Sequence, residues 1–365
     1  MTSVIRIAGS GPAGLTAAIN LARGGCRVEV FEKRPDSGRR FCGDLQGLDN
    51  WSVAGDIPDQ LREMGLTINF DCTPFSGLTV TNGARVWQFA TPRPAFFLVK
   101  RGSATGCLDQ GLKEQALAQG VTIRYNTPLA EEEADIVATG PRCRHIFALD
   151  KGIVFRTSMA DGAFGLVNDR AAFRGYSYLL VVNGYGCMCT VLFDAFADIR
   201  QCLAETRRIF ADLLPLDIRE PRPAGGVGSF TFPSRFQRGK TLFAGEAAGL
   251  QDLLWGFGMR SAITSGYLAA RSIMTGEDYP QLARRFFERR LKASLVSRYL
   301  WERFGHNSYA MIIDRIGGAR DPLAFLHSFH NFNWLQRLAY PFALRFCRKR
   351  YGRLWTAEPE EADDI

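Results

Sequence analysis

The residues best suited to chemistry near the N-terminus are closely spaced glycines and one carboxylate. Residues 9–14 read Gly-Ser-Gly-Pro-Ala-Gly, a GxGxxG spacing that follows a short apolar run. Such glycines allow a tight turn at Gly9, close approach of a pyrophosphate at Gly11 and close helix–strand packing at Gly14. Glu32 lies eighteen residues after Gly14, at the end of a second β-rich run, where a carboxylate can bind an adenosine ribose. The order strand, glycines, helix, strand and acid therefore predicts a dinucleotide-binding site.

A second carboxylate and a second group of glycines occur late in the chain. Residues 243–249 read Phe-Ala-Gly-Glu-Ala-Ala-Gly, and the run 256–262, Gly-Phe-Gly-Met-Arg-Ser-Ala, opens an expected helix. Glu246 is suited to bind the hydroxyls of a ribityl chain, and the bare backbone at Gly256 and Gly258 lets a flat isoalloxazine ring lie against it. The two motifs together favour FAD over NAD as the bound cofactor.

The elements that must position these residues alternate in type along the chain. Parallel βαβ segments are expected at about 1–35, 100–140 and 240–275, residues 34–51 are expected to form a loop, and Asn183-Gly184 predicts a hairpin turn. This order predicts an α/β fold in which a Rossmann-like FAD-binding domain is interrupted by an antiparallel β-sheet substrate domain and followed by a C-terminal helical region. The expected boundaries are 1–70, 100–145 and 236–280 for the FAD-binding domain, 71–99 and 146–235 for the substrate domain, 281–356 for the helical region and 357–365 for an acidic tail.

Composition and charge narrow the class of protein. The 365 residues are 46% hydrophobic and 22% charged, which indicates a folded soluble protein. The formal net charge of +8 suggests an anionic partner such as a dinucleotide, an acidic redox protein or a phospholipid surface, the alternative being that the charge serves solubility alone. Nine cysteines without a CxxC pair indicate free thiols in a reducing cytosol, and Cys187 and Cys189 are expected to pack in the core. We expect a cytoplasmic protein, without a signal peptide, metal site or nucleic-acid partner, and leave its oligomeric state open.

The chain resembles the flavoproteins of the p-hydroxybenzoate hydroxylase fold, most closely their geranylgeranyl reductase-like branch, over most of residues 1–280. The motifs that carry the resemblance are GSGPAG at 9–14 with Glu32, Phe41-Cys42-Gly43-Asp44, Arg101 with Asp109 ahead of a helix, the Ala-Thr-Gly turn at 138–140, and GEAAG followed by GFGMRSA. The resemblance implies that Arg101 lies near FAD and that Cys42 lies near the flavin and the substrate cavity.

Two features of the chain depart from this family. Glu246 replaces the usual aspartate and keeps the carboxylate. The aromatic-x-Trp-x-Phe-Pro run of the reductases is absent, and residues 176–182 read Tyr-Ser-Tyr-Leu-Leu-Val-Val in the comparable place. The WxWxIP run of flavin halogenases is also absent from the sequence, so a halogenase is not expected. These departures leave the substrate undefined.

The motifs and the resemblance together predict the residues of the site. Cys42 is the candidate for a catalytic acid or for a residue that shapes the cavity, with Asp44 as a weaker candidate. Tyr176, Tyr178, Trp255 and Phe257 are expected to line an apolar substrate cavity, the alternative being ordinary core packing. The expected cofactor-binding residues are Gly9, Gly11, Pro12, Ala13, Gly14, Glu32, Lys33, Cys42, Gly43, Arg101, Ala138, Thr139, Gly140, Gly245, Glu246, Gly249, Gly256, Phe257, Gly258 and Met259.

The activity implied is that of an FAD-dependent oxidoreductase. Hydride transfer at flavin N5 would reduce, or in reverse form, a C=C bond in an apolar, isoprenoid- or lipid-like substrate. NAD(P)H or a redox protein is the expected transient electron donor. Two alternatives remain open: a flavin-dependent aromatic monooxygenase of the same fold, and a non-enzymatic flavin- and lipid-binding protein at a membrane surface.

The C-terminal segment 334–353 combines bases with apolar side chains. It contains six basic residues and no acidic one, and aromatic residues and leucines are interleaved with them. Such a mixture predicts peripheral contact with the anionic inner face of a membrane. The alternative is a pair of helices packed on the body of the protein. Pro341 is expected to break the segment into two helical pieces.

Overall fold

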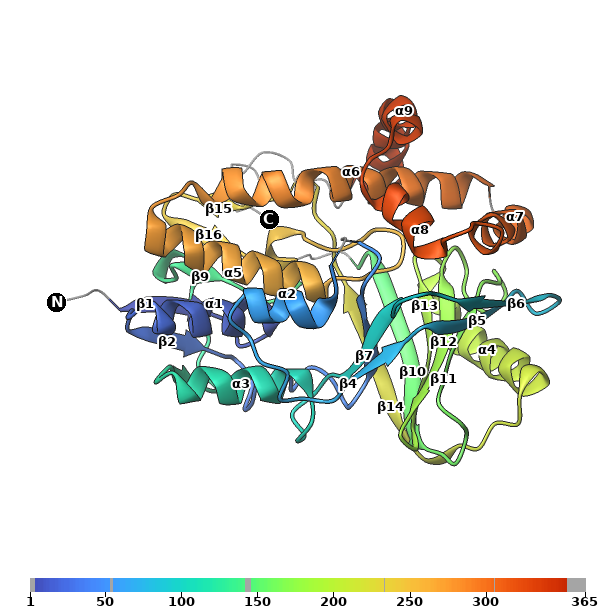
Figure 1. The fold of residues 1–365 in the computed structure, drawn as a ribbon, viewed down its shortest axis with the longest axis horizontal. Coiled ribbons are helices and arrows are strands. Elements are labelled where there is room, and N and C mark those ends of the chain that lie inside the picture. The colour runs from blue at the N-terminus through green and yellow to red at the C-terminus, as the bar shows by residue number, and fades with distance from the viewer. Residues whose placement is uncertain (1–3, 53–54, 142–145, 233, 305, 353–365) are drawn as a thin grey trace.

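A computed structural model describes residues 4–52, 55–141, 146–232, 234–304 and 306–352. The acidic tail at 357–365 and Arg353 lie outside these residues. In Figure 1 a sheet with helices on both faces lies at the left, a larger sheet lies at the right, and the last helices cover the upper right of the molecule. The predicted α/β fold with a C-terminal helical region is confirmed.

The sheet at the left has the strand order β15-β16-β9-β1-β2-β8. Its strands pair in parallel, except that β15 pairs antiparallel with β16. The chain passes from β1 through helix α1 into β2, as the glycine motif predicts. The bounds are β1 Ile5–Ala8, α1 Pro12–Arg23, β2 Val28–Phe31, α3 Leu108–Ala118, β8 Thr122–Arg124, β9 Ile136–Val137, β15 Gln237–Arg238, β16 Thr241–Phe243 and α5 Met259–Thr275.

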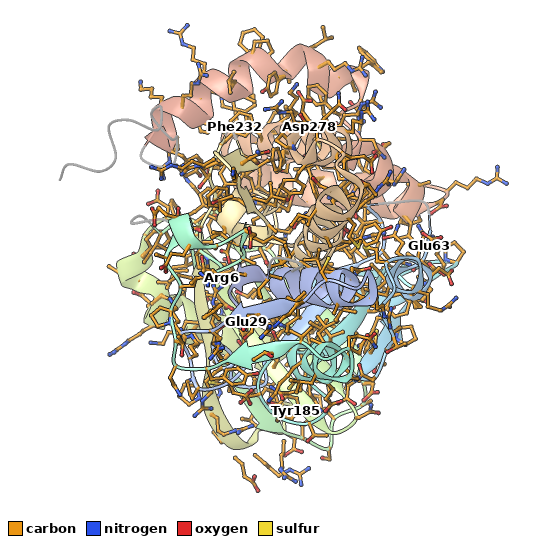
Figure 2. The ribbon with its side chains drawn as sticks, turned by 90° about the vertical axis from the view of Figure 1, so that its left-hand side faces the viewer. Arg6, Glu29, Glu63, Tyr185, Phe232 and Asp278 are labelled. Carbon is orange, nitrogen blue, oxygen red and sulfur yellow. The ribbon has the colours of Figure 1, made fainter. Side chains whose placement is uncertain are left out.

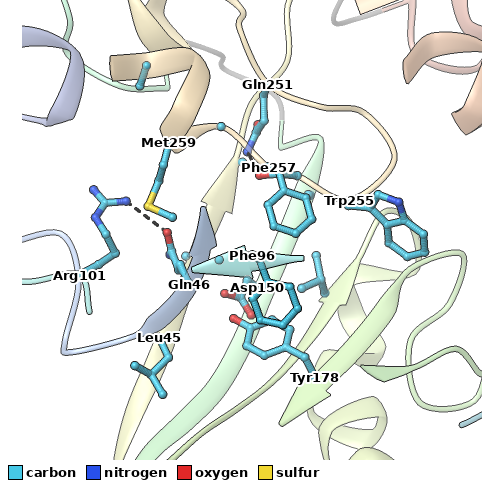
Figure 3. Close-up of a pocket in the computed structure, with 18 of the residues that line it drawn as sticks. Leu45, Gln46, Phe96, Arg101, Asp150, Tyr178, Gln251, Trp255, Phe257 and Met259 are labelled. Carbon is cyan, nitrogen blue, oxygen red and sulfur yellow. Dashed lines mark hydrogen bonds between the residues drawn. The ribbon is translucent and has the colours of Figure 1, made fainter. Parts of the chain in front are cut away.

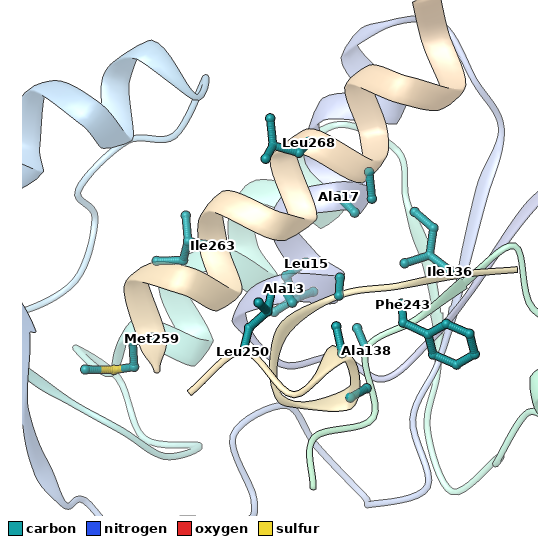
Figure 4. Close-up of a cluster of buried hydrophobic side chains, with 14 of the residues drawn as sticks. Ala13, Leu15, Ala17, Ile136, Ala138, Phe243, Leu250, Met259, Ile263 and Leu268 are labelled. Carbon is teal, nitrogen blue, oxygen red and sulfur yellow. The ribbon is translucent and has the colours of Figure 1, made fainter. Parts of the chain in front are cut away.

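Helices α1 and α5 pack against each other on one face of this sheet, as Figure 4 shows. The contact is close because small residues stand where the helices meet. A Cβ at Gly266 of α5 would overlap the carbonyl oxygen of Ala13 in α1, and a Cβ at Gly14 would overlap the carbonyl oxygen of Gly9. Gly14 therefore has the packing role expected of the third glycine of the motif.

The sheet at the right has the order β14-β10-β13-β12-β11-β5-β6. All neighbours are antiparallel except β11 and β5. Asn183 and Gly184 adopt positive φ angles between β12 and β13, which confirms the predicted hairpin. Cys187 and Cys189 are fully buried, as expected, with their sulfur atoms 3.7 Å apart. The bounds are β5 Gly77–Thr81, β6 Val86–Ala90, β10 Ala148–Arg156, β11 Gly162–Leu166, β12 Tyr176–Val182, β13 Tyr185–Leu192, α4 Ile199–Leu213 and β14 Arg219–Gly228.

A three-stranded antiparallel sheet joins the two larger sheets. Strand β7 (Phe96–Lys100) pairs with β3 (Leu45–Asp49) on one side and with β4 (Cys72–Phe75) on the other. The prediction of a loop over 34–51 is therefore wrong for β3. Its sequence, Leu-Gln-Gly-Leu-Asp, has low β propensity, and its pairing with a distant strand makes it extended. The proposed domain boundaries stay predictions.

The C-terminal region is helical, as expected. Helix α6 (Tyr279–Phe304) is followed by α7 (His306–Gly317), α8 (Pro322–His330) and α9 (Trp334–Arg350), while the short α2 (Ile57–Glu63) comes earlier in the chain. In Figure 2 these last helices lie above the parallel strands β1 and β2, which are marked by Arg6 and Glu29. No helix among the described residues has the length and apolar character needed to cross a bilayer.

Helix α9 is continuous through Pro341, so the predicted break is wrong. A proline inside a helix removes one backbone hydrogen bond to the residue four positions earlier. Pro341 is exposed, whereas Ala343 and Cys347 are buried against Leu295 and Val296 of α6. Packing on α6 holds the helix, and the backbone carbonyl freed by Pro341 is left on the water-facing side.

Candidate cofactor and substrate site

One cavity of about 650 Å³ joins the glycine turns to an apolar wall. Its polar end lies at the carboxyl ends of β1, β9 and β16, where open α/β sheets bind ligands. Its other end lies among the three-stranded sheet, the seven-stranded sheet and helices α7 and α8. Figure 3 shows the middle part, where Met259 and Phe257 face Gln46, Phe96 and Tyr178 across the cavity.

The first glycine turn leaves open space where a phosphate group would lie. Gly11 is the N-cap of α1, its φ is −83°, and a Cβ added to it would have no atom within 4 Å. The free N–H groups and the positive end of the helix dipole face this space. At the end of β2, Glu32 Oε2 accepts hydrogen bonds of 3.0 Å from both the backbone N–H and the hydroxyl of Ser10. The loop thus holds Glu32 at the rim of the cavity.

The second turn presents Glu246, which is held by two donors. Glu246 Oε1 accepts a 3.0 Å hydrogen bond from the backbone N–H of Ser229, and Oε2 lies 3.1 Å from Arg40 Nη1. Arg40 also lies beside Gly140, whose added Cβ would be 3.5 Å from its Nη1. Its guanidinium therefore stands between the Ala-Thr-Gly turn and the second glycine turn. Sequence reasoning missed this residue, although the Arg39-Arg40 pair in a glycine-rich loop beside the motif was a signal.

Arg101 is fixed by a buried ion pair. Its Nε and Nη2 atoms lie 2.8 and 2.9 Å from the two carboxylate oxygens of Asp109, and its Nη1 donates a 3.2 Å hydrogen bond to Gln46 Oε1 (Figure 3). The guanidinium also stacks over the Phe41 ring at 4.2 Å from its centroid. This arrangement presents Arg101 and Gln46 to the cavity from fixed positions. The role of Arg101 in cofactor binding stays a prediction.

Most of the expected cofactor-binding residues line the cavity. Four do not. Gly14 packs against the backbone of Gly9, Gly249 ends a 3₁₀ turn with a φ of +76°, and Cys42 and Gly43 also lie outside the lining. Those that line it are Gly9, Gly11, Pro12, Ala13, Glu32, Lys33, Arg101, Ala138, Thr139, Gly140, Gly245, Glu246, Gly256, Phe257, Gly258 and Met259.

The structure does not bring the expected catalytic pair to the cavity. Cys42 is exposed, and neither it nor Asp44 lines the cavity, although their neighbours Phe41 and Leu45 do. The Asp44 carboxylate accepts a 3.0 Å hydrogen bond from the backbone N–H of Cys42. Burial raises the pKa of Asp44 above its usual range. Asp44 therefore stabilises the loop in which Cys42 stands, and the catalytic roles of both residues stay predictions.

The four expected substrate-binding residues all line the cavity. The Tyr176 hydroxyl donates to the backbone carbonyl of Trp255, whose ring meets Tyr176 and Trp301 edge to face. Phe257 meets Trp51 in the same way, with ring centroids 5.0 Å apart. Apolar side chains from α7 and α8 extend this wall: Ile312, Ile313, Ile316, Leu323 and Leu326.

Sequence reasoning also missed Asp150, an acid on the floor of the cavity. It is the third residue of β10, paired with Val191 on one side and Gly226 on the other. Figure 3 shows its carboxylate beside the Tyr178 hydroxyl, and its Oδ1 is buried without a hydrogen-bond partner among the described residues. Burial, with the nearby charge of Asp44, raises the pKa of Asp150 to about 7. In the sequence Asp150 is an acid in a β-rich run, which does not mark it as a site residue.

The other carboxylates that line the cavity have charged or hydrogen-bonding partners, whereas Asp150 has no cationic partner among the described residues. Asp109 pairs with Arg101, Glu246 with Arg40, and Asp36 with Lys113 at 2.6 Å. Glu32 accepts backbone and hydroxyl hydrogen bonds. No cationic partner of Asp150 is found among the described residues, so it is the lining acid best able to hold a proton near neutral pH. No group of three metal-ligating side chains is found in the same described residues.

Known sequences and solved structures show which fold this architecture belongs to. Residues 7–43 match the model of the NAD(P)-binding Rossmann-like domain. No curated protein sequence matches the chain. Among solved structures, a geranylgeranyl bacteriochlorophyll reductase-like protein from Thermoplasma acidophilum superposes with a TM-score of 0.71 and 16% identity, over 95% of this chain and 98% of that one. This chain has the p-hydroxybenzoate hydroxylase fold.

Other proteins of this fold carry out different reactions. The flavin-dependent brominase Bmp2 superposes with a TM-score of 0.64 and 16% identity, over 96% of this chain and 98% of that one. A variant of 2-methyl-3-hydroxypyridine-5-carboxylic acid oxygenase superposes with a TM-score of 0.55 and 18% identity, over 90% and 96% of the two chains. At such identities the likeness establishes the fold alone, and the reaction must be argued from the site.

Proposed function

We propose that the protein is an FAD-dependent oxidoreductase that acts on a C=C bond of an apolar, isoprenoid- or lipid-like substrate. The observation that carries this proposal is one continuous cavity, which has two glycine turns and two acids of dinucleotide type at one end and an apolar wall at the other. A cofactor and an apolar substrate would meet in its middle. The likeness to a geranylgeranyl reductase-like structure supports the same reading.

The residues at the polar end fit FAD. The open space at Gly11 would take the pyrophosphate, and Arg40, which lines the same cavity, offers a cation. Glu32 and Glu246 would accept hydrogen bonds from the ribose and ribityl hydroxyls. The backbone at Gly256 and Gly258, where an added Cβ would have no atom closer than 3.6 Å, would let a flat ring approach. FAD, when bound, would supply or accept the hydride.

The chain itself would supply the proton. Reduction of a C=C bond adds a hydride to one carbon and a proton to the other. Asp150 is the group that we assign to this proton, because it faces the cavity, lies beside Tyr178 and lacks a cationic partner among the described residues. In the reverse direction its carboxylate would accept the proton. The apolar wall would exclude water and align the substrate chain.

An anaerobic turnover experiment tests the proposal. Flavin-loaded protein is reduced chemically, mixed with a polyprenyl alcohol in heavy water, and the product is analysed by mass spectrometry. We expect the flavin to reoxidise without oxygen and the product to gain two deuterium atoms, one through flavin N5, whose hydrogen exchanges with the solvent, and one as the proton from the acid. A Leu326→Trp variant, which fills the apolar end, should keep the flavin and lose this reaction. Reoxidation only after oxygen is admitted, with oxygen in the product, would instead establish the monooxygenase alternative.

A further inference from the structure

Helix α9 carries large apolar side chains on its outer face. Trp334, Leu335, Leu338 and Phe342 are each more than half exposed, although the opposite side of the helix packs on α6. At about 3.6 residues per turn these positions fall on one face of the helix. Figure 1 shows α9 at the top of the molecule, on the side of α6 away from the parallel sheet.

Basic side chains continue this face toward the C-terminal end of α9. Arg345 and Lys349 are exposed and fall between the apolar positions on the same side of the helix. Arg350 instead turns to the body, where it pairs with Asp194 and lies 3.6 Å from Glu302. Helix α9 contains no acidic residue. We define the outer face of α9 as Trp334, Leu335, Leu338, Phe342, Arg345 and Lys349.

We propose that the outer face of α9 docks the protein on an anionic lipid bilayer. The boundary between lipid headgroups and acyl chains accommodates apolar side chains that stand beside exposed bases. A second copy is a poor occupant, because each face carries bases and no acid, so pairing two of them would gather like charges at one interface. A nucleic acid would leave the leucines and Phe342 without an apolar partner.

The same helical region provides part of the apolar wall of the cavity. Ile313 of α7 and Leu323 of α8 line it, and α9 follows α8 after a short turn. A docked protein would hold this wall close to the membrane in which a lipid-like substrate dissolves. The docking proposal does not depend on the reaction, since it concerns only the outer face of α9.

Co-sedimentation of the flavin-loaded full chain with vesicles tests the proposal. We expect the protein to pellet with phosphatidylcholine vesicles that contain phosphatidylglycerol, to do so less at high salt, and to remain in the supernatant with phosphatidylcholine alone. Replacing Arg345 and Lys349 by Gln should weaken binding by roughly thirtyfold, which corresponds to about 2 kcal/mol for two charges. Leu338→Gln with Phe342→Gln should weaken it by at least about tenfold.

Matched variants separate docking from general attraction to a basic protein. Arg207→Gln with Lys240→Gln removes two exposed bases elsewhere, and Leu117→Gln with Val86→Gln removes two exposed apolar side chains elsewhere. Both should bind like the unchanged protein. Equal loss in these controls, or no pelleting with anionic vesicles, would overturn the proposal. If the protein does not bind vesicles, two further results would overturn the proposal by identifying another occupant. One is a dimer that Leu338→Gln abolishes, and the other is RNA binding that survives the apolar substitutions.

Discussion

At the residue scale, the proton transfer that we propose depends on which acidic side chain reaches the cavity. The sequence motif favoured Cys42 and Asp44, whereas the structure presents Asp150. A motif gives residue types in order along the chain, but it does not say which side of a loop faces a cavity formed by distant strands. Asp150 could not be identified from the sequence, because its side chain reaches the cavity only through the pairing of β10 with β13 and β14. Both of these strands lie far from β10 along the chain.

The raised pKa of Asp150, about 7, makes its role testable through pH. The protonated form is present below this value and is lost above it, so C=C reduction should be fast below pH 7 and fall as the pH rises through it. Asp150→Asn cannot donate a proton from a carboxyl group. We expect it to keep FAD, to react roughly 10²-fold more slowly and to lose this pH dependence. Stopped-flow reoxidation of the flavin across pH measures both effects.

Cys42→Ala provides the comparison, because the sequence made Cys42 the candidate for a catalytic acid or for a residue that shapes the cavity. With Asp150 as the proton donor, Cys42→Ala keeps the flavin, most of the turnover and the pH profile of the unchanged protein. Large loss of turnover in Cys42→Ala, together with an unaltered profile in Asp150→Asn, would return the acid role to Cys42.

At the element scale, the parts that the sequence predicts well are those with a local cause. Gly9, Gly11 and Gly14 fix the turn and helix after β1, and Asn183-Gly184 fixes a hairpin. The failures have non-local causes. Strand β3 is extended because β7 pairs with it, and α9 passes through Pro341 because α6 packs along it. Partners far along the chain override local propensity in both cases.

The contact between α1 and α5 gives a prediction about stability. Gly266→Ala would place a methyl group against the backbone carbonyl of Ala13, so the helices must move apart. We expect a loss of about 1–3 kcal/mol in the free energy of unfolding, measured by denaturant titration. Gly55→Ala is the control, since its Cβ would have no atom within 4 Å. Equal stability of the two variants would show that the helices are not held this closely.

At the scale of the whole molecule, the site is assembled from segments far apart in the sequence. The glycine turns of residues 9–14 and 245–258 meet at one edge of the parallel sheet, and strands β10, β12 and β13 close the cavity below them. The sequence predicts the polar end, because each motif implies its own contact with a cofactor. The apolar extension under α7 and α8 was not predicted, because helices with ordinary apolar residues carry no signal of the cavity that they cover.

FAD binding through the glycine turn is the central claim, and replacing Gly11 tests it most directly. Its φ is negative and its Cβ would enter open space, so Gly11→Leu should fold normally while its side chain occupies the place of the pyrophosphate. The measurement is the FAD released on denaturation after reconstitution, with circular dichroism as the check on folding and Gly55→Leu as the control. We predict FAD close to equimolar with the chain in the unchanged protein and in the control, and almost none in folded Gly11→Leu. An unchanged protein that takes up no FAD, or a Gly11→Leu variant that retains it in full, would contradict the claim.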